Sequence, residues 1–298
     1  MKTIIITGSD SNYFNHLITL CDSLKIHKVL NDIDLGILDA GLNNDQKKTI
    51  SKYTNIFVEP EWNFKKNFKA ENWKKLLTVR PYLQNYFPGY ENYIWMDADM
   101  IPLSNNFINV IIQVFQNHEK EICVCNENDN SYINSNKDKS FQKLFGKIYK
   151  MSGWVYKNNY KYFGSKEADR LLGKPLINAG FFALKSKSII WEEWKEIYGN
   201  IVESNNDEYC LSMDQSSLNI TSYNNIDKVS FLDCKFNWLN KNCLPIIKNN
   251  KFCKPTFPYD EIEIMHNTSF DIDKENLFYD FKSQKKINNS LRKLLNKN

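Results

Sequence analysis

The chain has 298 residues, a length that supports one sizeable α/β domain or two small ones without disulfides or metals to stabilise the core. A hydrophobic fraction of 42% and an aromatic fraction of 14% are those of a folded protein and exclude a disordered chain. The formal net charge is only +4 and the lysines are spread along the chain, so the composition does not indicate nucleic-acid binding.

The N-terminal residues enter a short apolar strand at once, and no long apolar segment with a cleavage site follows, as a signal peptide would require. No stretch approaches the roughly 20 apolar residues of a membrane-spanning helix. The seven cysteines form no CxxC pair, and Cys21, Cys123 and Cys125 lie among apolar neighbours, as buried free thiols do. We therefore expect a cytoplasmic protein in a reducing environment.

Short β-branched runs alternate with amphipathic segments over the first half of the chain. Strands are predicted over residues 3–7, 34–38 and 55–58, and helices over 14–25, 45–53 and 71–86. This alternation predicts an α/β fold in which helices flank a mainly parallel central sheet.

The next predicted strand, residues 93–96, runs directly into Asp97-Ala98-Asp99. Side chains two residues apart share a face in extended backbone, so the carboxylates of Asp97 and Asp99 can converge. Paired carboxylates suit Mg²⁺ or Mn²⁺ bridging to a diphosphate, because these ions prefer oxygen ligands. Two solvated carboxylates in a turn would give the same triplet, but open α/β sheets bind ligands at the carboxyl ends of their strands.

The second half of the chain continues the alternation of helices and strands. Helices are predicted over residues 106–116, 141–149 and 189–203, strands over 121–125 and 176–184, and an exposed Asn-rich loop over 126–139. We expect a single domain over residues 1–281, followed by a basic helical tail over 282–298. The tail is either a solvated helix or a peripheral contact with an anionic membrane surface.

Residues 93–103 (YIWMDADMIPL) resemble the signature of glycosyltransferase family eight, which includes glycogenins and bacterial lipopolysaccharide galactosyltransferases. Further resemblances follow in order over most of the chain. They imply a GT-A fold, which is a Rossmann-like nucleotide-binding domain, and a metal-dependent hexosyltransferase. Its donor would be a nucleotide sugar, with UDP as the nucleotide. Its acceptor would be a glycan, a lipid-linked molecule or a protein, and the anomeric configuration would be retained.

Residues 6–13 (ITGSDSNY) resemble the family's nucleotide-binding turn. This resemblance assigns donor contacts to Thr7, Gly8, Asp10, Asn12 and Tyr13. The Tyr13 ring would stack on the base, although a ring packed beneath the first helix would give the same sequence. Arg80 stands where the family carries a basic residue for nucleotide or phosphate contact, and a surface arginine is the alternative. Asp97 and Ala98 complete the expected nucleotide contacts.

Residues 176–184 (LINAGFFAL) resemble the family's strand whose Asn and Ala approach the donor sugar. The resemblance implies these roles for Asn178 and Ala179. Small residues in such a strand let the backbone come close to a ligand, and an Asn inside an apolar run needs a polar partner.

Residues 213–219 (MDQSSLN) resemble the family's DQD helix. The resemblance makes Asp214 an acceptor for a sugar hydroxyl and places Gln215 beside the anomeric carbon. With Asn178, these two residues are the predicted catalytic set. The third acid of the family's pattern is replaced by Ser216 in this chain.

Residues 261–267 (EIEIMHN) resemble the strand that ends in the family's histidine ligand. The resemblance implies that Asp97, Asp99 and His266 bind Mn²⁺ or Mg²⁺, and imidazole is an acceptable ligand beside carboxylates. A structural histidine would fit the same pattern. The family's closing loop, G-x-KPW, is missing: the chain reads TSFDIDK over residues 268–274, where Lys274 is a candidate substitute.

Two other functions fit parts of the sequence. A phosphatase of the haloacid-dehalogenase type also places D-x-D after an apolar strand, although usually after the first strand of the fold. A non-catalytic relative would bind a nucleotide sugar or a glycan without turnover. The aromatic stretch over residues 154–163 is the expected acceptor surface, with a lid or a dimer surface as the alternative. The sequence does not specify the sugar, the acceptor or the oligomeric state.

Overall fold

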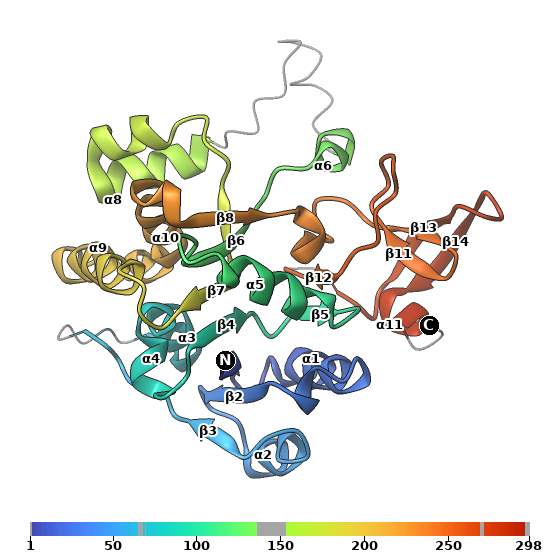
Figure 1. Ribbon diagram of the computed structural model, residues 1–298, viewed down its shortest axis with the longest axis horizontal. Coiled ribbons are helices and arrows are strands. Elements are labelled where there is room, and N and C mark those ends of the chain that lie inside the picture. The colour runs from blue at the N-terminus through green and yellow to red at the C-terminus, as the bar shows by residue number, and fades with distance from the viewer. Residues whose placement is uncertain (1, 65–67, 69, 136–152, 269–270, 296–298) are drawn as a thin grey trace.

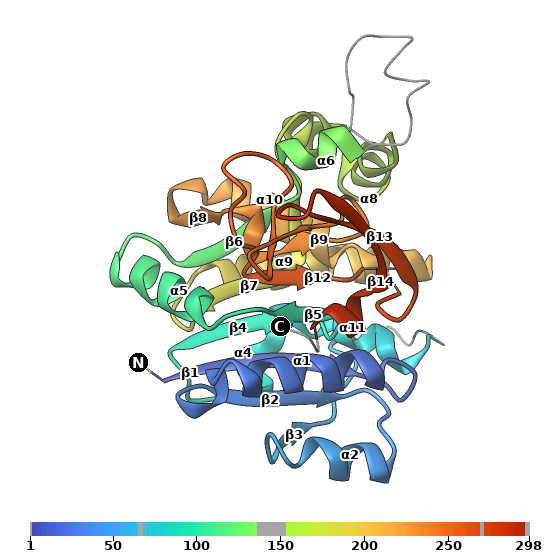
Figure 2. The same ribbon diagram turned by 90° about the vertical axis from the view of Figure 1, so that its right-hand side faces the viewer.

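The computed structural model describes residues 2–64, 68, 70–135, 153–268 and 271–295. Its main sheet has seven strands in the order β3-β2-β1-β4-β7-β6-β8 (Figures 1 and 2). The strands span Thr3–Ser9 (β1), Asp34–Asp39 (β2), Ile56–Val58 (β3), Asn92–Met96 (β4), Ile122–Asn126 (β6), Ile177–Lys185 (β7) and Val229–Leu232 (β8). β1 pairs in parallel with β2 and β4, β2 with β3, and β6 with β8, whereas β7 runs antiparallel to both of its neighbours. The predicted α/β fold with a mainly parallel sheet is confirmed.

Helices cover both faces of this sheet, and successive residues of each strand point to opposite faces. In β4, Tyr93 and Trp95 pack into one core, while Ile94 and Met96 pack into the other. The first core includes residues of α4 (Leu83–Tyr86), α9 (Ile190–Ser204) and α10 (Asp214–Asn224), and the second those of α1 (Phe14–Ile26), α2 (Asn44–Ile50) and α5 (Asn106–Gln116). Burial on both faces explains why the strands read as nearly continuous apolar runs.

The segment predicted as one helix over residues 71–86 is broken into short turns. These are η2 (Asn72–Lys74), α3 (Lys75–Thr78), η3 (Arg80–Tyr82) and α4. Pro81 causes the break, because proline has no N–H to donate and its ring clashes with the preceding turn. Arg80 lies at the break and is buried rather than on a helix surface. Other short 3-10 helices are η1 (Val29–Asn31), η4 (Glu208–Ser212), η5 (Ile226–Lys228) and η6 (Cys234–Phe236).

The structure also has two smaller sheets, which were not predicted from the sequence. One has the order β5-β12-β9 and the other the order β11-β10-β13-β14. Their strands are β5 (Met100–Pro102), β9 (Trp238–Leu239), β10 (Ile246–Lys248), β11 (Lys251–Cys253), β12 (Ile264–His266), β13 (Glu275–Asp280) and β14 (Lys285–Ser290). A third core, which includes Trp238, Phe252 and Phe278, lies beneath them.

The prediction of a helical tail over residues 282–298 is wrong between residues 285 and 290, where the chain forms β14. This strand pairs antiparallel with β13 over six residue pairs, so the predicted boundary at 281/282 falls inside a hairpin. Only α11 (Leu291–Leu295) is helical in the described part of the tail. The lysines of this segment suggested a solvated helix, but Ile287 and Leu291 pack into the third core and hold the strand in place.

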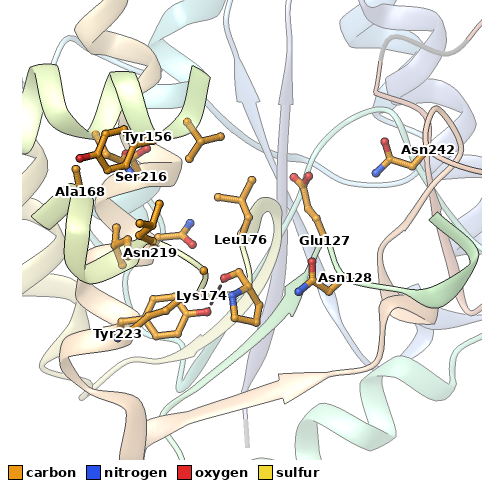
Figure 3. A pocket seen from close by; sticks show the side chains of 16 residues that line it. Glu127, Asn128, Tyr156, Ala168, Lys174, Leu176, Ser216, Asn219, Tyr223 and Asn242 are labelled. Atoms are coloured by element: carbon orange, nitrogen blue, oxygen red, sulfur yellow. Dashed lines mark hydrogen bonds between the residues drawn. The ribbon is translucent and has the colours of Figure 1, made fainter. Parts of the chain in front are cut away.

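A helical lobe lies beyond the β6 and β7 ends of the sheet (Figure 2). It contains α6 (Asn130–Ser135), which corrects part of the loop predicted over 126–139, and α8 (Gly153–Leu171), which contains the predicted aromatic stretch. The helix predicted over 141–149 lies outside the described residues. α8, α10 and the segment that leads into β7 surround a cavity (Figure 3).

The thiols and helices bear on two further expectations from the sequence. Cys21, Cys123 and Cys125 are buried free thiols, as predicted. Among the helices in the described ranges, none is both long enough and apolar enough to cross a membrane.

Replacing Leu291 by Ala should destabilise the protein by about 2–5 kcal/mol, because this fully buried side chain packs into the third core. Chemical denaturation followed by fluorescence measures the loss. Lys293→Ala, on the exposed face of the same helix, is the matched control and should change stability by less than about 0.5 kcal/mol. Equal stability of both variants would contradict the packing of this tail against the domain.

Candidate functional site

The candidate site lies at one edge of the main sheet. The carboxyl ends of β1, β4 and β6 meet there, and β7 brings its amino end to the same edge because it runs antiparallel. Asp97 and Asp99 follow β4, and Asn178 lies at the start of β7. β12 pairs with β5, so that His266 lies opposite Met100. Segments far apart in the sequence thus meet at the predicted ligand-binding edge.

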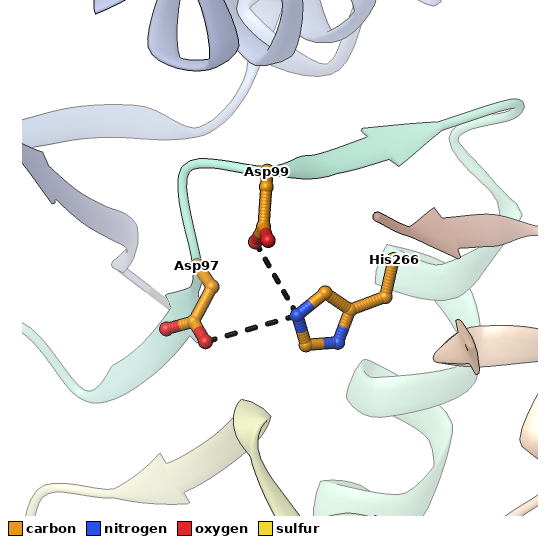
Figure 4. Close-up of side chains that lie close together, drawn as sticks. All are labelled: Asp97, Asp99 and His266. Atoms are coloured by element: carbon orange, nitrogen blue, oxygen red, sulfur yellow. Dashed lines mark ion pairs between the residues drawn. The ribbon is translucent and has the colours of Figure 1, made fainter. Parts of the chain in front are cut away.

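Asp97, Asp99 and His266 form a cluster whose ligand atoms all lie within 4.8 Å of one another (Figure 4). His266 Nε2 is 3.3 Å from Asp99 Oδ1 and 3.8 Å from Asp97 Oδ2. Ligands held about 2.1 Å from one ion lie no more than about 4.2 Å apart, so both separations are compatible with a shared cation. Two carboxylate oxygens and an imidazole form a donor set that suits Mn²⁺ or Mg²⁺.

Each aspartate uses one oxygen to hold its position and directs the other toward His266. Asp97 Oδ1 accepts hydrogen bonds from Arg80 Nη2 at 2.5 Å and from Trp95 Nε1 at 2.7 Å. Asp99 Oδ2 accepts one from the Tyr13 hydroxyl at 3.1 Å. These hydrogen bonds leave Asp97 Oδ2 and Asp99 Oδ1 pre-positioned as ligands. Supporting hydrogen bonds orient the ligands of metal sites in the same way.

A chain of side-chain amides orients the His266 ring. The Gly180 N–H donates to Asn178 Oδ1, which fixes the orientation of that amide, and Asn237 Nδ2 donates to the same oxygen at 3.1 Å. Asn237 Oδ1 must then accept from His266 Nδ1–H, 2.8 Å away. The proton on Nδ1 leaves Nε2 as the ring nitrogen that faces the carboxylates. Thr268 Oγ1 also lies 2.7 Å from Nε2.

The charges of the cluster stabilise one another. Burial alone would raise the pKa of Asp99, but His266 and the hydrogen bonds from His266 and Tyr13 lower it below its usual value. Burial alone would lower the pKa of His266, yet Asp99 and Asp97 raise it. Burial and the Asp99 charge raise the pKa of Tyr13, so its hydroxyl stays a donor. A bound cation and a proton would compete for His266 Nε2.

Gly180 leaves the space that the cluster occupies. A Cβ atom at this position would lie 2.5 Å from His266 Cε1 and 2.8 Å from Asp97 Oδ2. In the sequence this glycine stands out only as part of the strand motif. Its lack of a side chain lets two metal-ligand candidates approach the β7 backbone, and it supports the fit of the site to a cation.

Arg80 lies inside the protein and joins the acidic pair to the predicted catalytic helix. Its Nη1 donates to Asp214 Oδ2 and its Nη2 to Asp97 Oδ1, both at 2.5 Å. The guanidinium also stacks over the Trp95 ring at 5.1 Å. The alternative of a surface arginine is wrong, because the side chain is buried and both terminal nitrogens hold carboxylates. The nucleotide or phosphate contact stays a prediction. Arg80 therefore positions Asp97 and Asp214.

Two predicted catalytic residues, Asp214 and Gln215, begin α10 and face the β7 strand. The Asp214 carboxylate is buried against Arg80. Gln215 Oε1 accepts from the Ala179 N–H at 3.0 Å, and this contact ties the helix to the strand. The third, Asn178, donates from Nδ2 to Glu127 Oε1 at 2.9 Å. The structure thus brings together all three residues predicted from the two motifs.

The residues of the predicted nucleotide turn differ in exposure. Thr7 is buried, and a Cβ at Gly8 would lie 2.5 Å from Leu76 Cδ2, so both are packed within the sheet. Asp10 Oδ1 accepts from the N–H groups of Asn12 and Tyr13 and shapes the turn into α1. The Tyr13 ring is 41% exposed and stacks on His16 rather than beneath the helix. Ala98 is buried between the two acids.

Three polar residues of the site were missed in the sequence. Asn237 and Thr268 contact the ring nitrogens of His266. Glu127 accepts the last hydrogen bond of the series that runs from His266 through Asn237 and Asn178. Asn237 stands between Phe236 and Trp238, and a polar residue in such an apolar setting is the signal that a buried partner exists. Glu127 carried no signal, because it opens a polar stretch of the sequence.

The fold and the site define a glycosyltransferase of the GT-A type. The family model for glycosyl transferase family 8 matches residues 4–267, and the chain belongs to that family.

The chain is also similar to solved glycosyltransferase structures. A galactosyltransferase, LgtC, in complex with donor and acceptor sugar analogues, is 14% identical with a TM-score of 0.52, over 88% of this chain and 86% of that one. Mouse xyloside xylosyltransferase 1 is 12% identical with a TM-score of 0.52, over 91% and 99%. The bifunctional glycosyltransferase WbbM is 14% identical with a TM-score of 0.54, over 89% and 45%. At these identities the likeness concerns the fold, and a search of curated protein sequences found no match.

Gly180→Ala should lower the affinity for Mn²⁺ at least about tenfold while leaving the fold intact, because the new methyl group displaces His266 and Asp97. Electron paramagnetic resonance titration of free Mn²⁺ measures the affinity. Gly199→Ala is the control: its Cβ meets no atom within 4 Å, and alanine favours a helix by about 1 kcal/mol. Unchanged Mn²⁺ affinity in the Gly180 variant would exclude this cluster as the metal site.

Arg80→Ala should destabilise the protein by about 3–5 kcal/mol, because it leaves the buried Asp214 and the partly buried Asp97 without their cation. Urea denaturation measures the loss, and adding Asp214→Asn to this variant should recover part of it. The comparison is Lys251→Ala, which breaks an exposed pair with Glu261 and should cost no more than about 1 kcal/mol. Similar losses from Arg80 and Lys251 would show that Arg80 is not a buried bridge.

Proposed function

We propose that this glycosyltransferase uses a nucleotide sugar, with UDP as the nucleotide, and a divalent cation, Mn²⁺ or Mg²⁺. The observation that supports the metal is the convergence of Asp97 Oδ2, Asp99 Oδ1 and His266 Nε2. When bound, the cation would neutralise the negative charge that develops on the leaving nucleoside diphosphate. The acceptor is a glycan, a lipid-linked molecule or a protein that presents a carbohydrate or hydroxyl group.

The residues of the chain position the donor and stabilise its charges. Asp10, Asn12 and Tyr13 surround the turn after β1, where the exposed ring of Tyr13 is available to stack on the base. Asn178 on β7 and Gln215 on α10 lie near the proposed metal ligands, and the transferred sugar would bind beside them. Fixed hydrogen-bonding groups of this kind need no reorganisation during the reaction, which lowers its barrier.

Retention of the anomeric configuration is proposed from family membership. In a front-side displacement, the bond from the anomeric carbon to the diphosphate breaks as the acceptor oxygen attacks the same face. The leaving phosphate oxygen takes the acceptor's proton, so no separate carboxylate base is needed. By resemblance to the family, Gln215 and Asp214 would face the positive charge that develops on the anomeric carbon.

The alternative functions lack support from the structure and the family. A haloacid-dehalogenase phosphatase would carry its acidic motif after the first strand, whereas Asp97 follows β4, in the middle of the sheet. Cytoplasmic location stays a prediction from the sequence. Contact of the basic C-terminal segment with an anionic membrane and a dimer surface over residues 154–163 stay alternatives.

Asp99→Asn should reduce Mn²⁺-dependent release of nucleoside diphosphate by more than about 100-fold, because the amide replaces a charged ligand. A panel of nucleotide sugars, assayed with Mn²⁺, with Mg²⁺ and after chelation, measures the loss and identifies the donor. Asp45→Asn, on the exposed helix α2, is the control and should retain wild-type activity. Metal-independent hydrolysis of p-nitrophenyl phosphate, with no nucleotide sugar consumed, would overturn the proposal.

A further inference from the structure

A cavity of about 430 Å³ is lined by residues that include Glu127 and Ser216 (Figure 3). Its walls come from α8, from α10, from the segment that leads into β7 and from the residues after β6. Binding sites for small molecules usually have volumes of about 300–1,000 Å³, so the cavity is large enough for a ligand. Asp97, Asp99 and His266 are not among its lining residues.

The chemistry of the lining suits an uncharged polar ligand with apolar faces. Amides and hydroxyls provide the polar groups, including Asn159, Ser216 and Tyr156, while leucines 171, 172 and 176 provide apolar wall. The cavity has one cation and one anion among its lining residues, Lys174 and Glu127, so it has no excess charge to favour a phosphate or an amine. Sugar rings combine hydroxyls with apolar CH faces and match such a lining.

Asn159 is the feature that points to a ligand. The residue is only 4% exposed, and its Oδ1 atom is buried without a hydrogen-bond partner. A buried acceptor without a donor costs about 1–3 kcal/mol, so such atoms in folded proteins call for an explanation. Asn159 also lines the cavity; its oxygen is closed to solvent in the orientation shown, and rotation of the amide would turn it toward a hydroxyl group of a ligand.

Two lining residues connect the cavity to the predicted catalytic residues. Glu127 lines it and accepts a hydrogen bond from Asn178. Ser216, which directly follows Gln215, also lines it. The family's pattern has an acid at this position, and the smaller, neutral serine leaves room and removes a charge. A ligand in the cavity would thus have one end beside two of the predicted catalytic residues.

We infer that this cavity binds a neutral sugar unit of the acceptor, with Asn159 Oδ1 accepting a hydrogen bond from a sugar hydroxyl. The inference rests on the proposed function and specifies the class of acceptor, a molecule that carries a neutral sugar unit. It also narrows the acceptor surface expected over residues 154–163, because Asn159 and Tyr156 of that stretch line the cavity while Tyr160 is 55% exposed.

Asn159→Leu tests the inference, because leucine keeps the volume and removes the acceptor oxygen. The variant should lower the ratio of sugar transfer to donor hydrolysis at least about tenfold, through a higher KM for the acceptor. Its melting temperature should not fall, since an unsatisfied buried group has been removed. Lys157→Leu, on the exposed face of α8, is the control and should leave transfer, hydrolysis and the acceptor KM unchanged.

Direct binding separates failure of the inference from failure of the proposed function. Saturation-transfer NMR with methyl glycosides of glucose, galactose, N-acetylglucosamine and xylose, recorded without donor or metal, should show binding to the wild type. Asn159→Leu should lose this signal. Loss of binding supports the cavity even if no nucleotide sugar is consumed. An absence of binding by every glycoside, or equal binding and equal transfer by a folded Asn159→Leu variant, overturns it.

Discussion

The site depends on holding two carboxylates close together where little water can screen them. Two charges 4 Å apart interact with about 4 kcal/mol at an effective dielectric constant of 20, so Asp97 and Asp99 would repel each other strongly if left alone. The surroundings offset this repulsion with the Arg80 guanidinium, the His266 ring and hydrogen bonds from Trp95 and Tyr13. The repulsion that remains is what makes the pair a binding site for a cation.

The order and direction of the strands bring these groups together. β7 lies between β4 and β6 and runs antiparallel to both, so its first residues come to the edge where the parallel strands end. The side chain of Asn178 and the bare backbone at Gly180 thereby reach the acidic pair. The β5–β12 pairing then adds His266 from a separate sheet. The three candidate metal ligands therefore come together only when the C-terminal region has folded against the main sheet.

Much of the fold and of the site could be predicted because the signals are local. The strand alternation showed the sheet, and the motifs around Asp97, Asn178, Asp214 and His266 stand in single short segments. The burial of Arg80 could not be predicted, because its surroundings are set by the break at Pro81 and by a partner 134 residues away. Asn237 and Glu127 act through contacts between distant segments, and β14 is held by core partners that its lysine-rich sequence does not reveal.

The amides that orient His266 have a consequence for the site as a whole. Hydrogen bonds are donated in one direction, from His266 to Asn237, then to Asn178 and finally to the Glu127 carboxylate at the cavity wall. No amide in this series can flip alone without placing two donors or two acceptors face to face. The orientation of the His266 ring is therefore linked, through Asn237 and Asn178, to the Glu127 carboxylate at the cavity wall. A group that turns at one end of this series requires the groups at the other end to turn as well.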